Sequence, residues 1–183
     1  MSYQPQSNEF PTIESFDRHL NRLQEESLKV LQSEFSDTPS DMNDDESIRR
    51  IEFGKMFVSL WKHASNADGV VDPNEEFNVS NILHGFFAED GLFPPSIFPQ
   101  DQVFDELISA FLAPQEYDHV VQYAKDRPGL LPIFFAEACI IVASDSHYQL
   151  LEHKFLEKLG QDLNLNEKTQ QEIRNKYLHF FDN

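Results

Sequence analysis

The stretch of sequence that most constrains the fold is residues 66–76, which has the pattern of a tight connection between two helices. Gly69 is the residue type that most readily takes the left-handed conformation at a helix C-terminus. Asp72 and Pro73 suit the N-cap and the first turn of a following helix, and Glu75 suits its N3 position. The pattern therefore predicts a helical hairpin that turns at Gly69.

A weaker copy of this connector occurs at residues 143–152. In it, Asp145 and Glu152 have the same separation as Asp68 and Glu75. Apolar residues then fall into register as well: Phe57 with Phe134, Val79 with Leu156, and Ile82 with Leu159. The two copies predict an internal duplication, with two pseudo-symmetric helical hairpins.

The two aspartates are unusual, because each is predicted in the last turn of a helix, where a carboxylate is disfavoured by about 0.3–1 kcal/mol. Two hairpins packed about a pseudo-twofold axis would bring Asp68, Glu75, Asp145 and Glu152 together. Such a cluster needs a counter-charge, and Ca²⁺, Mg²⁺ or Mn²⁺ is the natural one. The alternative is that the aspartates are solvated caps, the glutamates are capping-box residues, and the connectors never meet.

Three histidines near the connectors could supply softer ligands for Zn²⁺ or Ni²⁺, which we consider less favoured than the hard cations. They are His63, His147 and His153. The alternative for each is an interaction with exposed carbonyls at a helix end.

Apolar residues at three- and four-residue spacing predict an all-α, single-domain helical bundle of about seven to eight helices, with no strand. The expected helices are 14–35, 47–67, 73–87, 101–112, 114–126, 130–144, 150–160 and 167–180. The segment 130–144 is apolar almost all round and is predicted to be the most buried helix. The proline-rich segment 92–100 is predicted to be a loop.

The chain divides into an N-terminal part, residues 1–45, and a helical domain, residues 46–183. The first part combines a polar tail, an amphipathic helix and an acidic linker. Its helix either packs in the core or docks as an appendage, on the bundle or on another chain. A length of 183 residues suits one domain.

The charge balance favours cations or a basic or membrane-associated protein as partners. The chain has 14 Lys and Arg against 32 Asp and Glu, a formal charge of −18. This excess argues against nucleic acids and against anionic membrane surfaces. The lone cysteine, Cys139, lies in an apolar run, which excludes a disulfide framework. Without an apolar stretch long enough to span a bilayer, the sequence predicts a cytoplasmic protein.

The first connector resembles the TerB-like family, the helical component of tellurite-resistance and related stress operons. Residues 67–75 match its Ala-Asp-Gly-x-(Val/Ile)-x-x-x-Glu signature, and residues 143–159 resemble its second hairpin. Ser146 and Gln149 depart from the pattern, where glycine and a cap residue would be typical. The resemblance covers roughly residues 53–176. It implies a helical bundle with metal ligands on its two connectors, and it implies no reaction.

The sequence gives no positive support for catalysis. An EF-hand starting at Asp68 fails, because Val70 and Pro73 occupy positions that need a ligand and a glycine. Glu116 and His119 have the Glu-x-x-His spacing of di-iron bundles, but no second motif accompanies them. We therefore expect a non-enzymatic cation-binding protein. A metal-dependent hydrolase is a remote alternative, and a protein-interaction scaffold with an acidic surface and no metal site is the main one.

Overall fold

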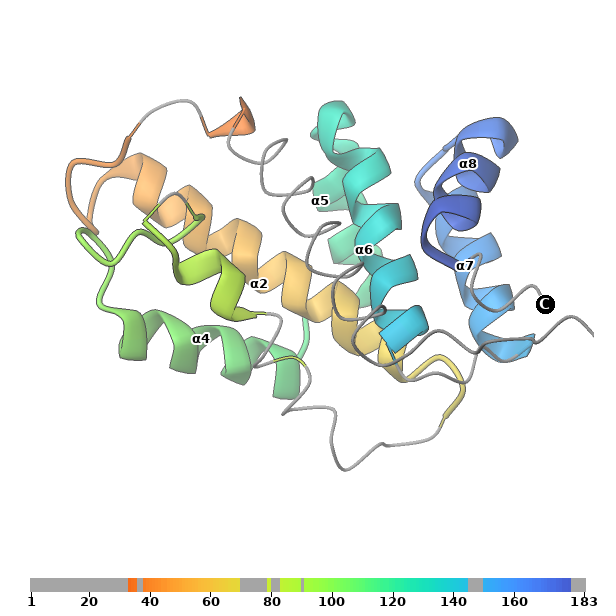
Figure 1. Cartoon of the computed structure of the whole chain (residues 1–183), viewed down its shortest axis with the longest axis horizontal. Helices are drawn as coiled ribbons and strands as arrows, with labels where there is room; N and C mark the ends of the chain where they lie inside the picture. The colour runs from red at the N-terminus through yellow and green to blue at the C-terminus, as the bar shows by residue number, and fades with distance from the viewer. Residues whose placement is uncertain are drawn as a thin grey trace, which may run out of the picture.

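The computed structural model describes residues 33–35, 38–69, 79, 83–89, 91–144 and 150–178. Within these residues the chain forms six α-helices and two short 3-10 helices, and it contains no strand (Figure 1). The α-helices are α2 (Asp45–Ser65), α4 (Gln100–Leu112), α5 (Tyr117–Lys125), α6 (Leu131–Ser144), α7 (Leu150–Asp162) and α8 (Glu167–Leu178). The 3-10 helices are η1 (His84–Phe87) and η2 (Pro128–Leu130). The prediction of an all-α, single helical bundle is confirmed.

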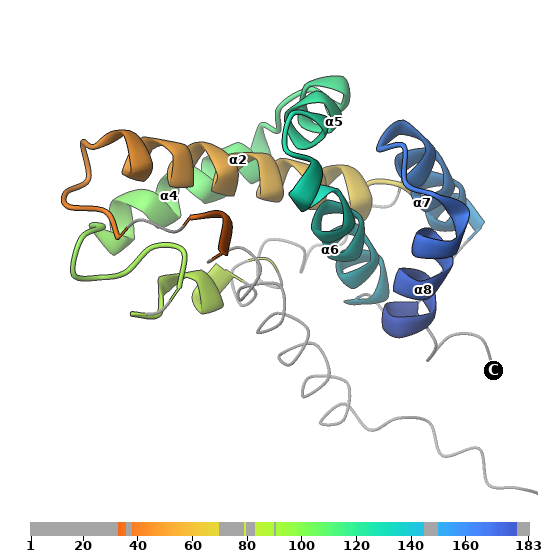
Figure 2. The same ribbon diagram turned by 90° about the horizontal axis from the view of Figure 1, so that it is seen from above.

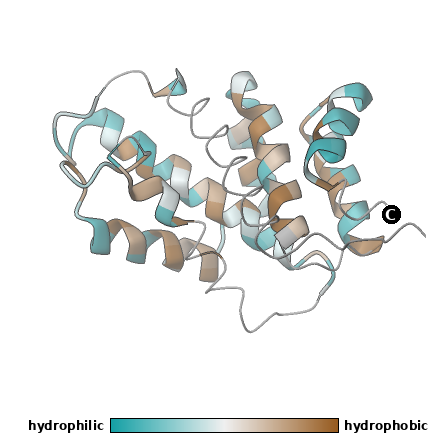
Figure 3. Ribbon diagram, in the orientation of Figure 1, coloured by the Kyte–Doolittle hydropathy of each residue, from teal (hydrophilic) through white to brown (hydrophobic). Residues whose placement is uncertain are grey.

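Helices α2 and α6 form the centre of the bundle. α2 contacts α4, α5, α6 and α7, and α6 also contacts α5, α7 and α8. Every residue of α6 from 133 to 143 is buried, as the apolar sequence of this helix predicts. Most of α6 has the colour of hydrophobic residues in Figure 3. Aromatic rings join the two helices, with the centroids of Phe57 and Phe134 4.9 Å apart in an edge-to-face arrangement.

The start of α2 is set by Asp44, so the helix begins before the predicted Ser47. The carboxylate of Asp44 accepts the N–H of Ser47 at 2.7 Å through Oδ1, and that of Ser40 at 2.7 Å through Oδ2. These backbone hydrogen bonds hold the pKa of Asp44 well below its usual range. The end of the predicted acidic linker is therefore a helix N-terminus, favoured by the acidic residues of its first turn.

Helix α4 lies alongside α2, and Gly54 allows the close approach. A Cβ atom at Gly54 would lie 2.8 Å from Cζ of Phe93 and 2.9 Å from Cδ2 of Leu107. The proline-rich segment is a loop, as predicted, and it buries Phe93 and Phe98 against the bundle. Helix α4 begins at Gln100, one residue before the predicted start, and its N-cap residue, Pro99, makes no side-chain hydrogen bond.

Helix α5 starts later than the predicted Pro114 because α2 bonds the preceding backbone. The N–H of Gln115 donates to Oγ of Ser59 at 3.1 Å. The carbonyl oxygen of Gln115 lies 2.8 Å from Nε2 of His63, which donates to it. These two bonds hold the connection between α4 and α5 in an open, non-helical conformation.

Helix α7 continues past Gly160, where the sequence predicted its end. Asn164 closes the turn instead, with a φ of 56° in the left-handed region. The N–H of Leu165 then donates to the carbonyl of Gly160 at 3.0 Å. The last helix begins at Glu167, as predicted, and is capped by Asn166, whose Oδ1 accepts the N–H of Thr169 at 2.9 Å.

Two large apolar residues within the predicted helices 47–67 and 150–160 are exposed. Ile48 in α2 is 56% exposed and Leu151 in α7 is 48% exposed. Both lie in the first turn of their helices, where Glu46 and Ser47 of α2 and Glu152 of α7 are the buried residues instead. Residues 14–32 of the first predicted helix and most of the predicted helix 73–87 lie outside the described residues. In the described part, no helix is long and apolar enough to cross a membrane.

Candidate metal centre and its surroundings

The first predicted ligand, Asp68, lies in a turn beyond α2 and not in its last helical turn. The helix ends at Ser65, with Asn66 at the C-cap. Gly69 has a φ of 76°, as the connector pattern predicts, and its N–H donates to the carbonyl of Asn66 at 3.0 Å. The left-handed residue thus closes a separate turn after the helix. Asp68 is half-buried in this turn, three residues beyond Ser65, the last residue of the helix.

Glu152 is the other predicted ligand among the described residues, and it lies in the first turn of α7, where the connector pattern places it. It is 1% exposed, which is unusual for a carboxylate. A carboxylate so withdrawn from water is costly unless it is hydrogen-bonded, paired with a cation or bound to a metal ion.

The helices that carry these two residues contact each other. α2, α6 and α7 touch pairwise, and the C-terminal end of α2 points towards α7 in both views (Figures 1 and 2). Glu75 and Asp145 lie outside the described residues. Among the residues that are described, no group of three or more His, Cys, Asp or Glu side chains is placed to hold a metal ion.

The histidines near the connectors serve other contacts where they are described. His63 uses Nε2 to bond the carbonyl of Gln115, and its ring stands edge-on to Tyr117 at 5.7 Å. His153 lies one turn before Glu157, with Nε2 3.2 Å from Oε1. His147 lies outside the described residues.

A polar cluster ties α5 to α7 beside His63. The hydroxyl of Tyr117 donates to Oδ2 of Asp162 at 2.8 Å, and Nζ of Lys158 bonds the same oxygen at 2.5 Å. Nζ of Lys158 also lies 4.0 Å from the ring centroid of Tyr117. The bond from Lys158 lowers the pKa of Asp162. Burial and the bond to Asp162 raise the pKa of Tyr117, so the phenol stays protonated and acts as a donor, not as a base.

A buried glutamate, Glu137, was missed by the sequence reasoning. It is 2% exposed in the middle of α6, and its Oε2 accepts the indole N–H of Trp61 at 3.2 Å. Trp61 is fully buried and stacks on Phe86 with 5.8 Å between ring centroids. The signal was present in the sequence, since Glu137 is the one charged residue within the apolar segment 130–144.

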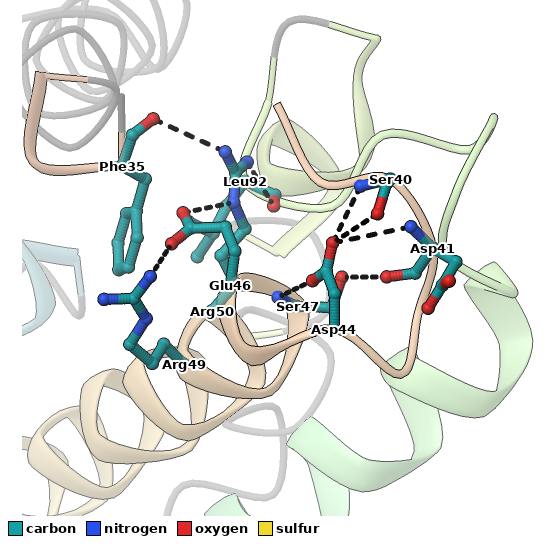
Figure 4. Close-up of polar contacts among 9 residues, drawn as sticks. All are labelled: Phe35, Ser40, Asp41, Asp44, Glu46, Ser47, Arg49, Arg50 and Leu92. Atoms are coloured by element: carbon teal, nitrogen blue, oxygen red, sulfur yellow. Dashed lines mark hydrogen bonds and ion pairs between the residues drawn. The ribbon is translucent and has the colours of Figure 1, made fainter. Parts of the chain in front are cut away.

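A buried ion pair at the start of α2 was also missed. Glu46 and Arg50 are each less than a tenth exposed, and Nε of Arg50 lies 3.2 Å from Oε1 of Glu46 (Figure 4). The i,i+4 spacing of opposite charges indicated the pair, but such pairs are usually exposed on helix surfaces. Here the guanidinium also bonds the backbone of two other segments, at Phe35 and Leu92.

The thiol of Cys139 in α6 is buried, and the half-buried Arg174 of α8 acts on it electrostatically. Burial raises the pKa of Cys139 to about 12, and the charge of Arg174 opposes that rise. Nε and Nη2 of Arg174 are buried without a hydrogen-bond acceptor among the described residues. Its guanidinium lies 5.7 Å from the ring centroid of Phe135.

Comparison with known proteins adds no relative: no protein-family model, curated protein or solved structure matches the chain.

Proposed function

We propose that this protein is a cytoplasmic TerB-like protein of a tellurite, metal or oxidative stress-response system, and that it binds a divalent cation. The proposed ligands are Asp68, Glu75, Asp145 and Glu152, on two connectors of pseudo-symmetric hairpins. The proposed ion is Ca²⁺, Mg²⁺ or Mn²⁺, because carboxylate and carbonyl oxygens are the donors on offer. The role is binding without turnover.

The observation that carries this proposal is the burial of Glu152. An acid at the third residue of a helix is ordinarily a solvated capping residue, yet this carboxylate is 1% exposed. The contact between α2 and α7 supports the proposal further, since it joins the helix before the first connector to the helix after the second. The turn at Gly69 releases Asp68 from the helix, which suits a side chain that has to reach a shared ion.

Thermal unfolding of the metal-stripped full chain tests the proposal. We expect one or two of Ca²⁺, Mg²⁺, Mn²⁺, Zn²⁺ and Ni²⁺ to stabilise it, by about 2.7 kcal/mol at about 100 times the Kd. The double variant Asp68→Asn/Asp145→Asn should fold and lose this gain. As a matched control, Asp101→Asn/Asp118→Asn removes two exposed carboxylates from first helical turns and should keep it. Retention of the ion-induced gain by the first variant would place the site elsewhere.

The second candidate function is a protein-interaction scaffold without a metal site. The observation that favours it is exposed apolar surface: Leu112 is 60% exposed and Leu150 is 68% exposed. The same experiment separates the two functions, because the scaffold predicts no stabilisation by any of the five ions.

A further inference from the structure

Phe35, one of the described residues before the acidic linker, packs its aromatic ring against the bundle. Phe35 is half-buried, and its ring centroid lies 5.3 Å from that of Phe53 at an interplanar angle of 71°. The guanidinium of Arg50 lies 5.5 Å from the centroid of the same ring. The ring of Phe35 thus makes an edge-to-face contact with Phe53 and a cation–π contact with Arg50.

The backbone at this point is bonded as well. Nη2 of Arg50 donates to the carbonyl oxygen of Phe35 at 3.4 Å, while Nη1 donates to the carbonyl of Leu92 at 3.2 Å (Figure 4). Ser33 and Glu34 are helical, and Phe35 is where the helical turn ends. A cation beside the last carbonyls of a helix is favourable, because those carbonyls carry partial negative charge.

Glu46 holds the guanidinium of Arg50 in position through an ion pair. It bonds Nε of Arg50 at 3.2 Å and a terminal nitrogen of Arg49 at 2.8 Å. Arg50 is 7% exposed, so its donors point at the Phe35 and Leu92 carbonyls from a fixed position. The segment makes a second contact with the bundle, where the carboxylate of Glu34 lies against Gly129 of η2.

The start of α2 does not depend on these contacts. Asp44 caps the helix, and Oγ of Ser47 donates to the carbonyl of Asp41 at 2.6 Å. Oδ1 of Asp41 in turn accepts the N–H of Asn43 at 2.8 Å. This turn is closed by its own hydrogen bonds, so Phe35 can leave without unwinding the helix.

We propose that Arg50 and Phe53 form a docking site for a helical turn that ends in an aromatic residue. Its occupant is this chain's own helical turn at residues 33–35, which acts as a tethered ligand. The segment binds by its ring and by its last carbonyl. When it leaves, the edge of Phe53 and one donor of Arg50 become open to the same segment supplied as a separate peptide.

The test uses the full chain and a fluorescent peptide of residues 14–37, followed by fluorescence anisotropy. The tethered segment competes with the peptide, so wild type should bind it at least about tenfold more weakly than the Phe35→Ala chain does. Adding Arg50→Met to Phe35→Ala should weaken peptide binding at least about tenfold. Adding Arg49→Met instead should leave it unchanged, because Arg49 pairs with Glu46, whereas it is the guanidinium of Arg50 that lies over the ring of Phe35.

Hydrogen exchange on the full chain gives a second readout. Phe35→Ala should raise exchange in the amides just before residue 36 while α2 and α6 keep their protection. Equal peptide binding by wild type and Phe35→Ala, or no effect of Arg50→Met, would overturn the proposal. Global unfolding of both Phe35→Ala and Phe35→Leu, seen by circular dichroism, would overturn it too, because the segment would then be part of the core.

Discussion

The indole nitrogen of Trp61 donates a hydrogen bond to Oε2 of Glu137 across 3.2 Å, and this bond joins α2 to α6 in the apolar centre of the bundle. Both residues are almost fully buried. A buried hydrogen bond adds only modestly to net stability. Removing one of its two groups costs more, because the remaining donor or acceptor is then buried with neither a partner nor water.

We therefore expect Glu137→Gln to be tolerated and Glu137→Leu to destabilise the protein relative to it. The amide oxygen of glutamine can still accept the indole N–H, whereas leucine leaves that N–H unpaired, at a cost of about 1–3 kcal/mol. Urea unfolding followed by the emission of Trp61, the single tryptophan, measures both variants. Equal stability of the two variants would show that the bond contributes nothing.

Gly54→Ala should destabilise the bundle although alanine favours a helix by about 1 kcal/mol. The added Cβ would lie within 3 Å of Phe93 and Leu107, both fully buried, so packed side chains have to move. We expect a net loss of about 1–3 kcal/mol in the free energy of unfolding. Gly85→Ala is the matched control, because nothing lies within 4 Å of its Cβ position. Equal effects of the two substitutions would contradict the close approach of α4 to α2.

Arg174→Met should leave stability unchanged or raise it by about 1 kcal/mol, because it removes two buried nitrogens that lack an acceptor in the described part of the chain. Methionine keeps most of the stem that packs towards Phe135. Calorimetric melting of wild type and Arg174→Met compares their stabilities. Lys168→Met is the control, since Lys168 is 85% exposed and pairs weakly with Glu172. A clear loss of stability in Arg174→Met alone would indicate an anionic group beside the guanidinium.

The stability contributed by Asp162 should disappear in acid. Its pKa is lowered in the folded protein, chiefly by the bond from Lys158. A lowered folded-state pKa means that the contribution is present above the ordinary aspartate value of about 3.9 and is lost as the pH falls through the folded value. Asp162→Asn should therefore be less stable than wild type near pH 6, by less than about 1 kcal/mol for so exposed a pair.

The difference between these two proteins should close towards pH 2. Unfolding in urea at several pH values measures it, with Asp118→Asn as the control for an exposed carboxylate in a first helical turn. A gap between wild type and Asp162→Asn that stays constant down to pH 2 would show that Lys158 does not act through the charge of Asp162.

The helices with continuous apolar faces were predictable, and their ends were less so. α6 was placed correctly because an apolar run with one charge has no stable place except the core. The start of α5 depends on Ser59 and His63, which are far away in sequence and bond Gln115. No local pattern reports such a bond. Gly160 was taken for a helix end, but Asn164 takes the left-handed conformation in its place.

The candidate metal centre was predictable in part. The pattern placed Gly69 in the left-handed region and Glu152 in a first helical turn, because both follow from local backbone chemistry. It did not indicate that Glu152 would be buried, since burial depends on which helices pack over it. It also placed Asp68 within the helix, whereas α2 ends at Ser65.

Arg50 bonds its neighbours through their main-chain oxygens, and this has a consequence for how the sequence can drift over evolutionary time. A carbonyl is present whatever the side chain, so position 92 can change without losing its bond to the guanidinium. Arg50 and Glu46 have less freedom, because replacing either one breaks a buried ion pair. Substitution at this corner of the molecule should therefore be tolerated in the bonded loop, while the ion pair is kept or replaced as a unit.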